Sequence, residues 1–189
     1  MRVNLKKSVI FLSILIVGAM SLASCNKIAG LLSYNLALQT IDGQFTVPII
    51  ADTTQSQNAG TTTVYINVDS FIRASTGNNL GVNNISSVKV QSCSISAQNA
   101  DSHNNFANFQ SCDFSFSSDV NNSVIHPATI TNNPDTYAAS INLPVDNNLE
   151  LKSYLTGHQF SYFIKAKMRR PTTKQINCTV HVQLNITVQ

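Results

Sequence analysis

The sequence predicts an all-β protein, an antiparallel two-sheet β-sandwich of immunoglobulin-like or jelly-roll type with about eight strands. Apolar and polar residues alternate along several segments, which is the side-chain period of a strand with one buried face. Pairs of Asn recur between these segments, and Asn favours turns because it tolerates left-handed backbone and hydrogen-bonds its own main chain. Charged residues make up only 11% of the chain, which argues against disorder driven by net charge.

Period-two alternation predicts the strands of the first half in chain order. Three apolar triplets mark candidate strands: Tyr34, Leu36 and Leu38; Phe45, Val47 and Ile49; Val64, Ile66 and Val68. The next strand changes phase, because one face carries Val88 and Val90 and the other carries Cys93, Ile95 and Ala97. A β-bulge near Ser92 would reconcile the two phases.

The second half continues in the same way. One strand is predicted around Cys112, Phe114 and Phe116, and another runs from Tyr137 to Leu143 and stops at Pro144. A single helical turn is expected within Leu149–Leu155. The last two strands are Phe160–Met168 and Ile176–Val188, and Pro171–Lys174 reads as the loop of an antiparallel hairpin between them.

The N-terminus carries a secretory signal. Arg2, Lys6 and Lys7 form a basic region, Val9 to Met20 form an apolar region, and small residues lead to Cys25. The apolar run is shorter than the roughly 20 residues that a transmembrane helix needs. The segment Leu22-Ala23-Ser24-Cys25 resembles the lipobox of bacterial lipoproteins. That resemblance implies that the mature chain begins at Cys25 and that this residue carries a diacylglyceryl thioether and an N-acyl chain such as palmitate.

Three segments follow from this interpretation: a signal peptide over 1–24, a lipidated N-terminus and short tether over 25–33, and a β-sandwich over 34–189. The tether can span at most about 30 Å, so we expect the domain to lie close to the bilayer. Asn26 follows the cysteine, and the absence of Asp there favours the outer membrane. The predicted location is therefore the bacterial cell envelope, with the membrane as the partner that holds Cys25.

Charge excludes nucleic acid as a partner. Three of the twelve basic residues lie within 1–24, whereas all nine acidic residues lie after it, so the mature chain is formally neutral. The positive charge of the whole chain thus belongs to the signal peptide and gives no support for binding to nucleic acid.

The remaining cysteines, Cys93, Cys112 and Cys178, each fall on the apolar phase of a strand, which is typical of buried thiols. A Cys93–Cys112 bridge stays open as an alternative if their strands are neighbours. We predict no metal site, because no short Cys or His spacing occurs. The segments 99–105 and 119–122 contain one Asp each, which favours Asx turns over calcium loops.

We expect no catalytic or cofactor site. The histidines, His103, His126, His158 and His181, are scattered and read as solvated side chains. The G-x-S-x-G pattern of a nucleophile elbow does not occur in the sequence. Glu150 is the one glutamate of the chain, which makes a pair of catalytic carboxylates a strained interpretation.

One candidate binding feature is a basic stripe, Lys165, Lys167, Arg169 and Arg170. It would face acidic sugars or lipid phosphate, or else its lysines would guard an edge strand against pairing with a second chain. Phe163 is the aromatic residue best placed on the solvent side of a strand.

Loose motifs in the body, Ser87–Val90, Asn108–Ser111 and Leu151–Gly157, resemble those of small β-sandwich lipoproteins of bacterial envelopes. The resemblance implies no particular activity. We therefore expect a non-enzymatic, membrane-anchored accessory or binding module with an envelope protein or polysaccharide as its partner. The alternatives are a surface glycan-binding lipoprotein and a hydrolase with a cryptic carboxylate site.

Overall fold

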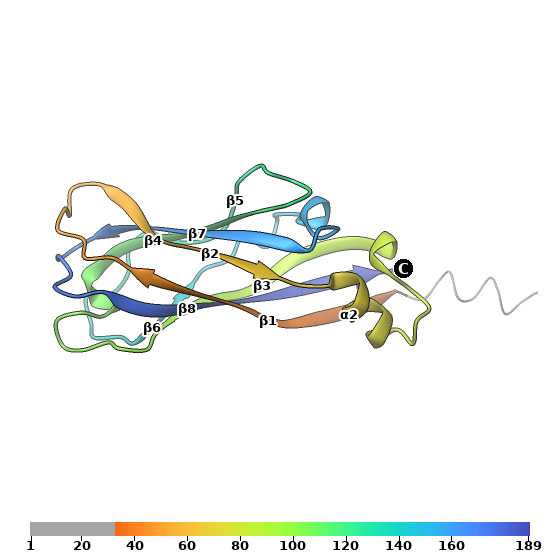
Figure 1. Ribbon diagram of the computed structural model, residues 1–189, viewed down its shortest axis with the longest axis horizontal. Coiled ribbons are helices and arrows are strands. Elements are labelled where there is room, and N and C mark those ends of the chain that lie inside the picture. Colours follow the sequence, from red (N-terminus) through yellow and green to blue (C-terminus); the bar gives the residue numbers. More distant parts are fainter. Residues whose placement is uncertain (1–32) are drawn as a thin grey trace, which may run out of the picture. The chain divides into compact units, whose positions relative to one another are not determined.

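The computed structural model describes residues 33–189, apart from the side chains of residues 39 and 40, and the alternating segments form strands in two stacked layers (Figure 1). The strands are β1 (Tyr34–Val47), β2 (Ser56–Tyr65), β3 (Ile85–Ala97), β4 (Phe109–Ser118), β5 (Ile125–Ile130), β6 (Ser140–Leu143), β7 (Gln159–Met168) and β8 (Ile176–Val188). The predictions of a signal peptide, of lipid on Cys25 and of the tether up to Leu32 lie outside the described residues. Within 33–189, no helix is long and apolar enough to cross a bilayer.

The strand order identifies the sandwich as a jelly roll. One sheet has the order β1-β8-β3-β6 and the other β2-β7-β4-β5. Strands that follow each other along the chain therefore alternate between the sheets, except for β4 and β5, which pair directly. This is the eight-stranded double-sheet arrangement of jelly rolls, and it decides between the two sandwich types that the sequence left open.

The predicted hairpin of the last two strands is wrong. β7 pairs with β2 and β4 in one sheet, whereas β8 lies between β1 and β3 in the other. The connecting segment crosses between the layers, and Thr172 holds it there by accepting a hydrogen bond from the Ile50 amide (2.8 Å). Two adjacent alternating segments look the same whether they pair within a sheet or face each other across the core, so the sequence could not distinguish these cases.

Two predicted strands merge into one. The segments around Leu36 and Val47 form the single strand β1, which passes through Gly43. A Cβ on Gly43 would lie 2.7 Å from the Thr62 side chain and 3.2 Å from the Tyr162 ring, so the glycine permits close packing inside a strand instead of marking a turn. The predicted bulge in β3 is confirmed, because the register with β8 shifts between Val90 and Ser92.

Helix α2 (Val68–Ser75) was not predicted. The alternation of Val64, Ile66 and Val68 suggested that the strand continues to Val68. The structure instead ends β2 at Tyr65 and caps a helix with Asn67, whose side chain accepts a hydrogen bond from the Ser70 amide (2.9 Å). Val68 and Ile72, four residues apart, are the buried residues of this helix.

The remaining short elements are 3-10 turns. These are η2 (Val82–Asn84), η3 (Phe106–Asn108) and η4 (Lys152–Tyr154). The last one confirms the helical turn expected within 149–155. Strand β5 was not predicted, because Pro127 interrupts a short segment with weak alternation.

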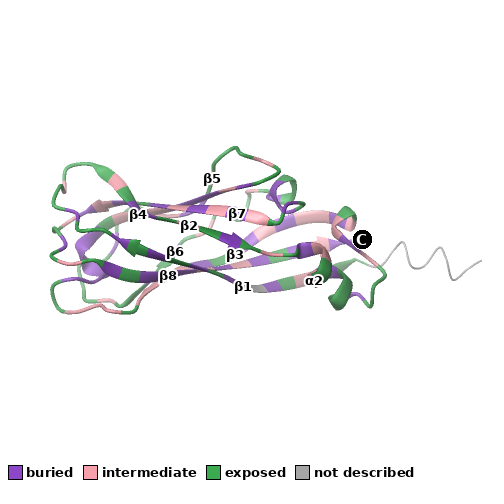
Figure 2. Cartoon of the chain, in the orientation of Figure 1, coloured by how far each residue is buried: buried purple, intermediate pink, exposed green. Residues whose placement is uncertain are grey.

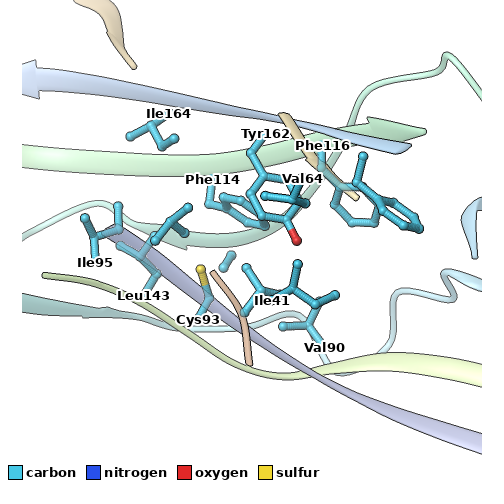
Figure 3. Close-up of a cluster of buried hydrophobic side chains, with 14 of the residues drawn as sticks. Ile41, Val64, Val90, Cys93, Ile95, Phe114, Phe116, Leu143, Tyr162 and Ile164 are labelled. Atoms are coloured by element: carbon cyan, nitrogen blue, oxygen red, sulfur yellow. The ribbon is translucent and has the colours of Figure 1, made fainter. Parts of the chain in front are cut away.

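The core lies between the two sheets, and buried and exposed residues alternate along the strands that enclose it (Figure 2). Figure 3 shows Ile95, Cys93 and Leu143 of one sheet facing Phe114 and Tyr162 of the other. The Phe114 and Tyr162 rings meet edge to face with centroids 5.1 Å apart, a favourable aromatic geometry. The polar residues of each strand are consequently presented on the two outer faces of the sandwich.

Candidate functional site

The outer face of the β2-β7-β4-β5 sheet carries the part of the basic stripe that is available to a ligand. Lys165 and Lys167 lie on the solvent side of β7, which is an interior strand between β2 and β4. The edge-guarding interpretation is therefore wrong, because β7 already has partners on both sides. Neither ammonium group has a hydrogen-bond or ion-pair partner among the described side chains and backbone.

The arginines of the predicted stripe have a structural role. Arg169 donates to the carbonyl oxygens of Ala107 (2.8 Å) and Asn133 (2.6 Å). Arg170 donates both terminal nitrogens to the Asp135 carboxylate (3.0 and 2.6 Å), and this hydrogen bonding holds the pKa of Asp135 below its usual range. Both arginines thus tie the end of β7 to neighbouring loops, which leaves Lys165 and Lys167 as the accessible cations of the stripe.

Lys165 borders a hollow of about 340 Å³ on this face. The hollow is lined by Asn58 of β2, Ser115 of β4, Val124, His126 of β5, and Phe163 and Lys165 of β7. Four strands or their ends therefore contribute to one depression. Such a mixture of apolar surface with a few converging polar groups is typical of small-ligand sites.

The histidine of this hollow is held by a carboxylate. Nδ1 of His126 lies 2.8 Å from Oδ2 of Asp113, and the Thr129 hydroxyl donates to the other carboxylate oxygen (2.7 Å). An ionised carboxylate only accepts hydrogen bonds, so His126 presents its Nε2 edge away from Asp113. His126 is solvent-exposed at the start of β5, as the sequence suggested, and the structure adds a fixed carboxylate partner that the sequence did not reveal.

Phe163 supplies the apolar part of the site. It is half-buried, and it lies two residues before Lys165 on the same strand face. Side chains of this spacing are about 7 Å apart along a strand. The hollow thus places an aromatic ring next to a free cation, flanked by the Asn58 amide and the His126 imidazole.

Sequence reasoning singled out Lys165 and Phe163 but missed Asn58, Asp113, Ser115 and His126. These four lie on strands far from β7 in sequence, and only strand pairing brings them together. The register Asn58↔Lys165 and Asp113↔Lys165 places β2 and β4 on either side of the lysine. No local motif carries this information.

The three cysteines of the sandwich are part of its core. Cys93, Cys112 and Cys178 are free, buried thiols. Burial raises the pKa of Cys112 and of Cys178 to about 12, which disfavours the reactive thiolate. Cys93 and Cys112 belong to different sheets, so they are not neighbours in a ladder.

The loop carboxylates also serve the fold. Asp101 accepts hydrogen bonds from the backbone amides of His103 (2.9 Å) and Asn104 (2.7 Å), as an Asx turn does. Glu150 accepts hydrogen bonds from the Ser87 hydroxyl (2.6 Å) and the Val88 amide (2.7 Å). Each of its two carboxylate oxygens therefore has a structural partner. Within residues 33–189, no group of three or more His, Cys, Asp or Glu could hold a metal ion.

Comparison with known proteins yields likeness in structure only. No protein-family model matches the chain, and no curated protein matches it in sequence. Among solved structures, a protein from Eubacterium rectale that is described as secreted has 12% sequence identity and a TM-score of 0.38. That likeness covers 83% of this chain and 40% of the other, so the chain spans less than half the length of that protein.

The capsid protein of BFDV in a decameric assembly is also similar, with 12% identity, a TM-score of 0.35, and coverage of 84% of this chain and 100% of the other. A mutant of CBM29-2, a family 29 carbohydrate-binding module, has 11% identity, a TM-score of 0.27, and coverage of 80% and 92%. Likeness at this level carries no argument about function. The assignment of the chain to the jelly-roll architecture follows from its own strand order.

Proposed function

We propose that this protein is a lipid-anchored binding module of the bacterial cell envelope that binds an acidic saccharide in the hollow around Lys165 and Phe163. The lipobox resemblance at Cys25 supports the anchor and the envelope location. The class of ligand is inferred from one observation: a free ammonium group and a half-buried aromatic ring line the same depression.

Each side chain of the hollow has a part in this proposal. The Lys165 ammonium pairs with the carboxylate of a uronic acid, and the Phe163 ring packs against the apolar C–H face of the sugar. The Asn58 amide and the outer edge of His126 bind hydroxyl groups. We prefer an acidic saccharide to a lipid phosphate as the ligand, because a phosphate group has no apolar face against which the Phe163 ring could pack.

The experiment that tests the proposal is calorimetric titration of the full-length protein in detergent with an oligomer of galacturonic acid. A galactose oligomer of equal length serves as the neutral probe. Lys165→Gln keeps most of the side-chain stem and removes the charge, so we expect affinity for the acidic oligomer to fall at least tenfold, about 1.4 kcal/mol. The wild-type affinity should also fall with added salt, because the cation is exposed.

Lys152→Gln is the matched control, since Lys152 is an exposed lysine outside the hollow. Phe163→Ala should weaken binding of the acidic oligomer, whereas Tyr65→Ala, which truncates an aromatic residue that is 74% exposed, should not. Equal affinity of the wild type for the acidic and neutral oligomers, or equal effects of the two lysine changes, would contradict the proposal.

A further inference from the structure

Three side chains from three strands form a continuous hydrogen-bonded chain on the other sheet, whose strands are β1, β8, β3 and β6. Oδ1 of Asp42 in β1 lies 2.8 Å from Nδ1 of His181 in β8. Nε2 of the same imidazole lies 2.9 Å from Oγ of Ser96 in β3. The residues are far apart in sequence, and the adjacency of β1, β8 and β3 brings them together.

The chemistry of the partners determines where the proton of His181 lies. The Asp42 carboxylate can only accept, so Nδ1 must carry the hydrogen. In the neutral imidazole, Nε2 is then the acceptor, and the Ser96 hydroxyl donates to it. This is the tautomer and the order of hydrogen bonds by which an imidazole acts as general base toward a serine nucleophile.

The second histidine–aspartate pair provides an internal comparison. His126 and Asp113 make the same contact at the same distance, 2.8 Å. No hydroxyl group of the described chain bonds to the remaining nitrogen of His126. His181 is also the less exposed of the two, with 31% of its side chain accessible against 55% for His126. Only the His181 pair therefore has a nucleophile in place.

The surroundings of Ser96 are polar. Thr179 is its Cα partner on β8, and the Thr179 hydroxyl oxygen accepts from Nε2 of Gln98 (3.3 Å), so its own hydrogen stays available as a donor. Next along the strands lies a depression of about 270 Å³ whose lining includes Gln44, Thr46, Gln98 and Asn177. Hydroxyl and amide groups of this kind suit a polar, hydroxyl-bearing molecule.

We propose that Ser96, His181 and Asp42 form a hydrolytic site for short-chain carboxylic esters of polar alcohols. Oγ of Ser96 adds to the ester carbonyl while its proton passes to Nε2 of His181. The Thr179 hydroxyl donates to the developing oxyanion. Asp42 orients the imidazole and stabilises its positive charge. The alcohol then leaves with the proton from His181, and an acyl group remains on Ser96.

Water completes the reaction. A water molecule adds to the acyl carbon and gives a proton to His181, and collapse of this intermediate releases the carboxylic acid and restores the Ser96 hydroxyl. Turnover should be slow, because a single side-chain hydroxyl supports the oxyanion where efficient hydrolases use several donors. This proposal departs from the expectation of a protein without enzymatic activity, and it is independent of the saccharide hollow on the opposite sheet.

The test treats the full-length protein in detergent with diisopropyl fluorophosphate, followed by peptide mass mapping. In this reaction, the Ser96 oxygen displaces fluoride from phosphorus, and the proton passes to His181. We expect one labelled residue, Ser96, and a label that is absent from heat-denatured protein. His181→Ala and Asp42→Asn should slow labelling and p-nitrophenyl acetate hydrolysis at least tenfold.

His103→Ala and Ser94→Ala are the controls, because they remove an exposed imidazole outside both candidate sites, whose Nδ1 contacts the Ser102 hydroxyl (3.0 Å), and a neighbouring hydroxyl on the same face of β3. Both variants should keep the wild-type rates, and melting temperatures verify that all variants are folded. Mapping of the label in the wild-type protein depends on no variant. A native protein that takes up no label at Ser96, or one whose labelling rate is unchanged by His181→Ala, would overturn the proposal.

Discussion

At the scale of single residues, polar side chains of the loops bind the sandwich together across long sequence separations. Asp101, in the loop after β3, accepts hydrogen bonds from two backbone amides and forms an ion pair with Lys174 (2.6 Å) before β8. The Lys174 contact, followed by the amide hydrogen bonds, lowers the pKa of Asp101 below its ordinary value of 3.8. One carboxylate thus connects two loops at one end of the sheets.

This coupling predicts how stability depends on pH. A lowered pKa means that the folded protein binds the proton less readily than the unfolded chain. The contribution of Asp101 is therefore present above about pH 3.8 and is lost as the pH falls through the folded pKa. Asp101→Asn should lower the melting temperature at pH 7, and the difference from wild type should shrink as the pH falls below 3.8.

Circular dichroism melts between pH 7 and pH 2.5 measure this difference. Asp146→Asn is the matched control, because the Asp146 side chain accepts one local hydrogen bond, from the Asn148 amide. A melting-temperature difference for Asp101→Asn that stays constant over the whole pH range would show that its charge does not contribute to stability.

At the scale of elements, β2 carries a β-bulge beside the hollow around Lys165. The register with β7 shifts between Asn58 and Gly60, and both Ala59 and Gly60 are buried. Asn58 accepts a hydrogen bond from the Gly60 amide (3.0 Å). Asn58, the residue just before the shift, is exposed, pairs in register with Lys165 and lines the hollow beside it.

Gly60 is required for this bulge to pack. A Cβ at this position would overlap the Phe45 ring of β1. Gly60→Ala should therefore lower the free energy of unfolding by about 1–3 kcal/mol, the usual cost of overpacking. Urea denaturation measures it, and Thr61→Ala, at the exposed neighbouring position, should change it by less than about 0.5 kcal/mol. Equal effects of the two changes would mean that the ring moves aside without cost.

At the scale of the whole molecule, the sandwich places its two candidate sites on opposite faces. Its core is continuous and apolar, and each sheet presents an outer face of its own: the hollow around Lys165 on one and the Asp42–His181–Ser96 chain on the other. Strand alternation makes this separation possible, because every second side chain of each sheet is free of the core.

The proposed attachment to the membrane also belongs to the scale of the whole molecule. Several acyl chains, at about 0.8 kcal/mol per buried CH₂, hold a protein at a bilayer far more firmly than one chain does. Cys25→Ala should therefore abolish metabolic labelling with palmitate and move the protein out of the membrane fraction. Cys178→Ala, which changes a buried cysteine of β8, should leave both unchanged. Retention of the Cys25→Ala protein in membranes would contradict the anchor.

Much of the fold was predictable because burial of one strand face imposes a pattern on neighbouring residues. The bulge near Ser92, the strand over 176–188 and the helical turn within 149–155 are all local patterns that the structure confirms. Helix α2 was missed because the strand-like alternation of Ile66 and Val68 runs into it. The hydrogen bond that caps the helix, from the Ser70 amide to Asn67, depends on the backbone leaving the sheet.

The candidate site was predictable only in the part that one strand carries. Lys165 and Phe163 are two residues apart on β7, so alternation alone places both on the solvent side. Arg169 and Arg170 belong to the same local stripe, but their carbonyl and carboxylate partners lie on other loops, and these contacts remove them from the site. Whether a surface cation is free depends on neighbours that are distant in sequence.

The sequence by itself determined that this is an all-β sandwich, which segments form most of its strands, and which of their faces point to solvent, because the period of side chains along a strand is a local property. Only the tertiary structure decided that the sandwich is a jelly roll, that the last two strands lie in different sheets, and that Asp42, Ser96 and His181 meet. The physical reason is that strands pair through backbone hydrogen bonds, which are the same for every sequence. The choice of partner strand therefore depends on how the whole core packs.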